Sequence, residues 1–222
     1  MSLVESFSAG LVAAALGWCA AGLQYRLYSN AEYRAHPAQG ARLLILRLFL
    51  SISSGVTVAL AFRPGHYDAG PAALTAVFAF ALLVTASTDF EHRIIPNLVS
   101  YPAIGLALAL SWAWPDRSVG AILLGGGFAL AVAAVLFALG VAVGALLGGG
   151  AALGMGDAKL MVWIGLLTGW PAVMSALVYG VLAAGVVAVV LLFRGGKRST
   201  FSYGPYLVFG ALIVMLFPGR FV

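Results

Sequence analysis

The stretch VGAILLGGGFALAVAAVLFALGVAV, residues 119–143, decides the class of fold. It contains no charged residue and is longer than the roughly 20 apolar residues that a helix needs to cross a bilayer. The rest of the chain is similar, because 63% of its 222 residues are hydrophobic and only 9% are charged. This composition excludes a soluble globular enzyme and a disordered chain. The sequence therefore predicts an all-α membrane protein.

Seven further apolar segments predict a polytopic protein with about eight transmembrane helices. The expected spans are residues 6–27, 43–62, 71–88, 98–114, 119–143, 158–170, 171–193 and 203–217. No internal repeat is evident, and we expect residues 1–222 to form a single integral membrane domain. Within the sixth span, Gly165 and Gly169 recur at a spacing of four, which indicates close helix packing through small residues.

The basic residues indicate how the helices are oriented. If both termini lie outside, only Arg63, Arg117 and Arg220 of the 12 Lys and Arg residues fall on the outer side, as the positive-inside rule requires. Residues 28–42 are then a short, polar first cytoplasmic loop, and residues 144–156 form a glycine-rich segment before the sixth span. The net charge of +5 is scattered along the chain, so it predicts no nucleic-acid partner.

Two of the seven Asp and Glu residues stand at the ends of apolar helices. Asp89 closes the third span in the string TDFEHRIIPN, residues 88–97, and Asp157 opens the sixth in GMGDAKL, residues 154–160. The predicted topology places both acids at the cytoplasmic ends of their helices. Asp157 also has the position of a helix cap, but an ionisable group at the edge of a span usually faces a partner or a wet cavity. We expect solvated positions for the other acids, Glu5, Glu32, Asp68, Glu91 and Asp116.

Two carboxylates at the same depth can share one proton, because adjacent like charges do not both ionise easily. One then acts as a base that deprotonates water, and the other protonates the carbonyl oxygen or the leaving amine. Cys19 is the single cysteine, and the three histidines lack the spacing of metal ligands, so we expect no metal site. Gly154 and Gly156 have no side chains, so an extended peptide backbone could approach Asp157 closely.

The two strings resemble the signature motifs of the prepilin peptidases, also called type IV leader peptidases, which are membrane aspartic proteases of the Gly-x-Gly-Asp type. The residues that match the first motif are Asp89, Ile95, Pro96 and Asn97, and those that match the second are Gly154, Gly156, Asp157 and Lys159. The segment YGPY, residues 203–206, is similar to one that opens the last span in the family. The resemblance extends from about Ala72 to the C-terminus.

This resemblance implies an aspartic endopeptidase that removes the short cytoplasmic leader of type IV prepilins or pseudopilins at the membrane interface. Asp89 and Asp157 would be its catalytic pair, with no cofactor. It further implies a bacterial inner-membrane protein whose active site faces the cytoplasm and whose partners are prepilin substrates and the lipid bilayer. Many family members carry paired Cys-x-x-Cys motifs in a larger first cytoplasmic region, linked to N-methylation. Residues 28–42 contain no cysteine, so we expect a peptidase-only form without the methyltransferase region.

Three alternative interpretations fit the sequence less well. Presenilin-like proteases resemble Tyr-Asp on one helix and Pro-Ala-Leu on a later one, whereas here Thr88 precedes Asp89 and Pro-Ala-Leu does not occur. A proton-coupled transporter could use the two acids as a relay, but inverted repeats and broken spans are not evident. A scaffold for pilus assembly would leave the two acids and the two glycines without a purpose.

Overall fold

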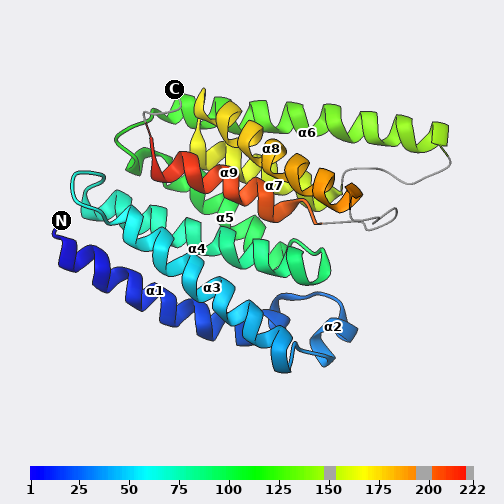
Figure 1. Ribbon diagram of the computed structural model, residues 1–222. Coiled ribbons are helices and arrows are strands. Elements are labelled where there is room, and N and C mark those ends of the chain that lie inside the picture. The colour runs from blue at the N-terminus through cyan, green and yellow to red at the C-terminus, as the bar shows by residue number, and fades with distance from the viewer. Residues whose placement is uncertain (148–153, 194–201, 219–222) are drawn as a thin grey trace. The chain divides into compact units, whose positions relative to one another are not determined.

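A computed structural model describes residues 1–147, 154–193 and 202–218 (Figure 1). All regular secondary structure in these described residues is helical. The helices are α1 (Leu3–Leu23), η1 (Gln24–Leu27), α2 (Ala31–Ala35), α3 (Gly40–Ala61), α4 (Ala69–His92), α5 (Asn97–Ala109), η2 (Ser111–Ala113), α6 (Val119–Leu147), α7 (Met155–Thr168), α8 (Ala172–Phe193) and α9 (Gly204–Leu216). The all-α prediction is therefore confirmed for the part of the chain that the structure describes.

Each predicted span overlaps one of the longer helices, but not every helix is long enough to cross a bilayer. Within the described residues, five helical segments are long and apolar enough: Leu3–Leu27, Gly40–Ala61, Ala69–His92, Val119–Ala142 and Ala172–Val190. The helices α5 and α9 have 13 residues each, and α7 has 14. At a rise of about 1.5 Å per residue, these are shorter than the hydrocarbon core. The count of eight spans and the sides of the termini stay predictions.

The region predicted as the first cytoplasmic loop, residues 28–42, is partly helical. Asn30 caps α2, because its side-chain oxygen accepts a hydrogen bond from the backbone N–H of Glu32 at 2.9 Å. The helix α3 already begins at Gly40, which has a positive φ of 57°. The range therefore contains the short helix α2 and the first residues of α3, and its place on the cytoplasmic side stays a prediction.

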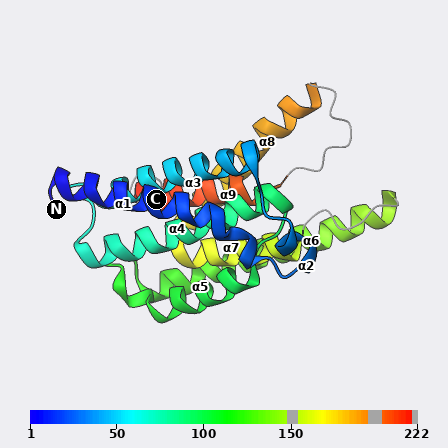
Figure 2. The same ribbon diagram turned by 90° about the horizontal axis from the view of Figure 1, so that it is seen from below.

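The described residues form two compact units, Met1–Ala103 and Ile104–Val222, and the boundary falls within α5. In the first unit, α3 packs against both α1 and α4 (Figures 1 and 2). A Cβ atom on Gly17 would lie 2.4 Å from the Leu50 carbonyl oxygen, so α1 and α3 approach closely there. The Ser54 hydroxyl donates to the Ala13 carbonyl at 2.9 Å, an interhelical bond of the kind common in membranes.

The second unit is also held by close contacts at glycines. Gly165 of α7 faces Gly125 of α6, and a Cβ on either residue would lie 2.4 Å from the other's carbonyl oxygen. Gly210 of α9 packs in the same way against α8, with its Cβ position 2.2 Å from the Ala176 carbonyl oxygen. These contacts confirm the prediction that Gly165 allows close packing. The expectation of a single domain over residues 1–222 stays a prediction.

Candidate active site

Asp89 lies in the last turn of α4, the 24-residue helix Ala69–His92. The residue is only 4% exposed, and the preceding polar residues Ser87 and Thr88 are fully buried. Arg93 then adopts a left-handed conformation, with φ 56° and ψ 41°, and its N–H donates to the Asp89 carbonyl at 2.8 Å. A non-glycine residue with positive φ is uncommon and marks a sharp change of chain direction. Asp89 is therefore buried in the last turn of α4, and this helix ends at His92, directly before the left-handed residue Arg93.

The Ile-Pro-Asn part of the first motif forms the connection to the next helix. Ile95 and Pro96 are buried, whereas Asn97, the first residue of α5, is exposed. The Pro96 carbonyl accepts hydrogen bonds from the backbone N–H and the hydroxyl of Ser100, both at 3.0 Å. These bonds start α5 directly after the proline. The motif residues of the first string are thus brought together around one tight helix-to-helix turn.

Glu91, two residues after Asp89, is the main feature of this region that sequence reasoning missed. Its side chain is 3% exposed, so the expectation of a solvated charge is wrong. The Tyr28 hydroxyl and the Gln24 amide each donate to Glu91 Oε2 at 2.5 Å. Arg42 Nε lies 3.6 Å from Glu91 Oε1, and its guanidinium also donates to the Glu91 carbonyl at 3.0 Å.

These partners explain how a carboxylate can be buried here, since a buried charge needs a counter-charge and hydrogen-bond donors. They also perturb Tyr28, which lies outside the spans: burial, and then the hydrogen bond to the Glu91 carboxylate, raise the pKa of its phenol well above the usual value. The rings of Tyr33 and His92 stack beside this group, with centroids 4.3 Å apart. No local sequence signal predicts these contacts, because all the partners are distant in sequence.

Asp157 lies in the first turn of α7, and its environment differs from that of Asp89. The residue is half-buried, and the N-cap residue Gly154 is exposed. A Cβ atom on Gly154 would lie 3.4 Å from Asp157 Oδ2, so the structure brings these two motif residues together. Gly156 and Lys159 are half-buried in the same turn. Of the predicted glycine-rich segment 144–156, residues 148–153 lie outside the described residues.

Tyr203 is a second residue to which sequence reasoning assigned no role. It is the N-cap residue of α9, the helix Gly204–Leu216, which contacts α7. Tyr203 and Asp157 both belong to the second unit. The signal that could have found it is the family-like segment at residues 203–206.

The predicted site residues thus fall into two groups, one in each unit. Asp89 and the Ile-Pro-Asn residues belong to the first unit, and Gly154, Gly156, Asp157 and Lys159 belong to the second. The direct pairing of the two carboxylates stays a prediction. Among the residues that the structure describes, no group of three His, Cys, Asp or Glu side chains is arranged to hold a metal ion.

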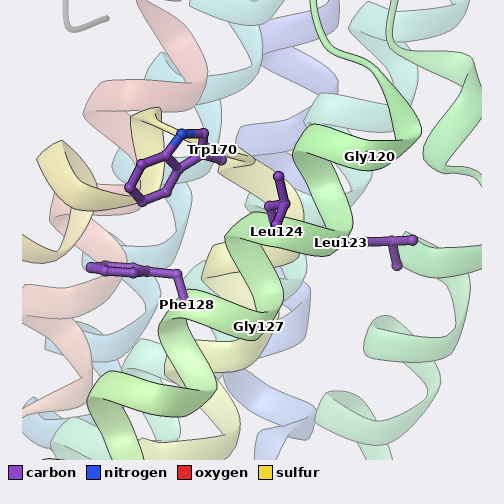
Figure 3. A pocket seen from close by; sticks show the side chains of 6 residues that line it. All are labelled: Gly120, Leu123, Leu124, Gly127, Phe128 and Trp170. Atoms are coloured by element: carbon purple, nitrogen blue, oxygen red, sulfur yellow. The ribbon is translucent and has the colours of Figure 1, made fainter.

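An apolar pocket in the second unit lies along α6, beside the turn that joins α7 and α8 (Figure 3). Its volume is about 580 Å³, and it is lined by Gly120, Leu123, Leu124, Gly127, Phe128 and Trp170. The rings of Phe128 and Trp170 form an edge contact with centroids 5.3 Å apart. None of the lining side chains can donate or accept a catalytic proton, so this pocket supplies no reaction chemistry.

Comparisons with known proteins agree with the motifs. The model of the type IV leader peptidase family matches residues 76–189, a range that includes both Asp89 and Asp157. Two curated relatives are named prepilin leader peptidase/N-methyltransferase, from Burkholderia pseudomallei strains 1026b and K96243. Each is 26% identical over 140 residues, which cover 62% of this chain and 44% of the relative.

The match therefore spans less than half the length of these curated relatives. No solved structure matches the chain. The family model, in contrast, covers more than half of the 222 residues. It also includes each of the two motif strings, Asp89 to Asn97 and Gly154 to Lys159. On this evidence the chain belongs to the type IV leader peptidase family.

Proposed function

We propose that this chain is a membrane-embedded aspartic endopeptidase that removes the cytoplasmic leader of type IV prepilins or pseudopilins. The observation that carries the proposal is the family match over residues 76–189, because it includes both acid-bearing motifs. The names of the curated relatives give the substrate class. Asp89 and Asp157 form the catalytic pair, and water is the nucleophile. No cofactor takes part in the reaction.

The two acids take different roles because they occupy opposite helix ends. Asp157 lies at a helix N-terminus, where the macrodipole favours a negative charge. Asp89 is buried at a helix C-terminus. We therefore assign the role of base to Asp157 and the role of acid to Asp89.

The reaction proceeds by two proton transfers around a tetrahedral intermediate. Asp157 removes a proton from water as the water oxygen bonds to the scissile carbonyl carbon, while Asp89 donates its proton to the carbonyl oxygen. When the carbon–nitrogen bond breaks, the proton held by Asp157 passes to the departing amine, and Asp89 recovers its proton from the hydroxyl. Both acids finish in their starting states.

The glycines and the membrane place the substrate. Gly154 is exposed beside the Asp157 carboxylate, so an extended leader backbone lies against it without meeting a side chain. The substrate's apolar helix stays in the bilayer, which the five long apolar helices of this chain also cross. Cleavage takes place at the cytoplasmic face of the bacterial inner membrane, and residues 1–222 act as one peptidase domain.

The test is cleavage of a prepilin that is co-reconstituted with the protein in lipid vesicles, with the cut located by mass spectrometry. The wild type should cut at the leader junction, and Asp89→Asn and Asp157→Asn should each lose at least about 10³-fold in rate. Asp68→Asn is the matched control, because Asp68 is exposed at the opposite end of α4.

Cleavage that survives either active-site variant would contradict the two-acid mechanism. If the wild type cuts none of several prepilins but takes up protons in an Asp89-dependent way, the transporter alternative replaces the proposal. Adding S-adenosylmethionine tests the peptidase-only form. We expect the trimmed N-terminus to remain unmethylated, because the chain lacks paired cysteines.

A further inference from the structure

We propose that Glu91 is a positioning residue for Asp89, and that it acts by fastening the segment 24–42 to the end of α4. This inference rests on the proposed peptidase function. The residues concerned are called here the Glu91 cluster, defined as Gln24, Tyr28, Arg42 and Glu91. All of them lie in the first unit, together with Asp89.

The Glu91 cluster contacts α4 on both sides of Asp89. The Gln24 amide nitrogen donates to Glu91, while its amide oxygen accepts from the Ser87 hydroxyl at 2.8 Å. Ser87 is two residues before Asp89, and Glu91 is two residues after it. A single side chain of η1 therefore binds the helix above and below the catalytic residue, which fixes the rotation of the last turn of α4.

Arg42 of the Glu91 cluster also fixes the residue at which α4 ends. The last carbonyl groups of a helix have no partner within the helix. The guanidinium of Arg42 donates to one of them, the Glu91 carbonyl, and its Nε also lies 3.6 Å from the Glu91 carboxylate. This double contact holds the final turn at a defined length before Arg93 changes the direction of the chain. The start of α3 thereby controls the place where Asp89 lies.

Burying the Glu91 side chain costs free energy. A carboxylate that is 3% exposed is unfavourable unless donors and a counter-charge surround it. A solvent-exposed polar residue at position 91 would end the helix without this cost. Because a misplacement of about 1 Å at a catalytic group can lower the rate about 100-fold, precise placement of the neighbouring Asp89 accounts for the buried charge.

The activity test compares three variants with the wild type in the vesicle assay. Glu91→Ala should lower kcat about 100-fold and leave KM within about twofold, because the reacting groups are misplaced while the substrate still binds. Tyr28→Phe, which removes one donor, should lower kcat about tenfold. Glu91→Gln keeps an acceptor oxygen for both donors, so it should restore kcat to within about tenfold of the wild type.

Tyr33→Phe is the matched control. It removes a hydroxyl from the same segment but keeps the ring that stacks on His92. Its kcat and KM should equal those of the wild type. A Glu91→Ala variant with normal kcat would overturn the proposal, and so would a raised KM with unchanged kcat, which would make the cluster a substrate-binding element.

A second readout does not depend on cleavage. Carbodiimide labelling, scored by mass spectrometry, reports whether Asp89 is accessible. Asp89 is 4% exposed in the folded protein, so we expect slow labelling in the wild type, Glu91→Gln and Tyr33→Phe, and labelling at least about tenfold faster in Glu91→Ala, as its helix end loosens. Equal labelling in all variants would overturn the role of Glu91 even if no prepilin is cut. Failure of the wild type to cut would overturn only the proposed function.

Discussion

The last turn of α4 carries Asp89 among buried polar side chains, whereas the first turn of α7 carries Asp157 directly after Gly154 and Gly156. At the α4 end, the carboxylate of Glu91 and its partners hold the chain through directional hydrogen bonds. At the α7 start, Gly154 is exposed and Asp157 is half-buried. One acid is therefore held by side chains, and the other has room for a substrate backbone beside it.

The position of Asp157 is defined from the far half of its helix. Gly165 and Gly125 bring the backbones of α7 and α6 into direct contact. Arg117 donates a hydrogen bond to the Leu167 carbonyl near the end of α7. These backbone contacts fix the position of α7 as a whole and leave its first turn, which carries Asp157, open to a substrate. The comparison shows two ways to position a carboxylate, one by a local polar cluster and one by remote helix packing.

The largest expected effect comes from lengthening each acid by one methylene group. Asp89→Glu should lose about 10³-fold in cleavage rate, because the buried site has no space for a shifted carboxylate. Asp157→Glu should lose only about 10²-fold, because the half-buried side chain can fold back toward its original position. Single-turnover cleavage in vesicles measures both. Equal losses would mean that the two helix ends are equally rigid.

The second effect separates remote packing from local chemistry. Gly165→Ala places a methyl group 2.4 Å from the Gly125 carbonyl oxygen, and such overpacking costs about 1–3 kcal/mol. Thermal unfolding in detergent should show a melting temperature lower by roughly 3–10 °C. Gly127→Ala on α6 is the control, because nothing lies within 4 Å of its Cβ position. A normal melting temperature for Gly165→Ala would contradict the packing account of α7.

A third change tests the space beside Asp157. Gly154→Ala should fold normally, because the φ of −77° suits any residue and the added Cβ meets Asp157 Oδ2 at an ordinary contact distance. Its kcat/KM should fall about tenfold, since the methyl group occupies the path of the leader backbone. Gly70→Ala, at the start of α4, is the control, with open space around its Cβ. Unchanged kcat/KM for Gly154→Ala would remove the glycine from the substrate path.

The smallest expected effect appears at alkaline pH and concerns only the Glu91 cluster. The folded protein raises the pKa of Tyr28 above its ordinary value of 10.0, so the phenol keeps its proton longer in the folded state than in the unfolded one. Its contribution to stability is therefore complete below pH 10 and declines as the pH rises above 10. Between pH 8 and pH 11 the wild type should lose up to about 1 kcal/mol more than Tyr28→Phe. Equal losses in a thermal unfolding series would contradict the buried hydrogen bond.

Local sequence patterns predicted the features that depend on local physics. The apolar segments located the longer helices, and the two motif strings located Asp89 and Asp157 at helix ends. The burial of Glu91 could not be predicted in this way, because its partners Gln24, Tyr28 and Arg42 are distant in sequence and contact it only in the folded chain. The same holds for Gly125, whose partner Gly165 lies on another helix. A charge beside His92 and Arg93 resembles a solvated cluster until its distant partners are known.

In the proposed mechanism, Asp89 and Asp157 work as one pair. The most direct test is cross-linking of an Asp89→Cys/Asp157→Cys double variant by a short bismaleimide in membranes. The background variant is Cys19→Ala, since Cys19 is exposed. An Arg42→Cys/Glu91→Cys pair serves as the positive control, because Arg42 Nε and Glu91 Oε1 lie 3.6 Å apart in the native protein. We expect both pairs to cross-link with similar yield. If the control pair cross-links while positions 89 and 157 do not, the pairing of Asp89 with Asp157 is contradicted.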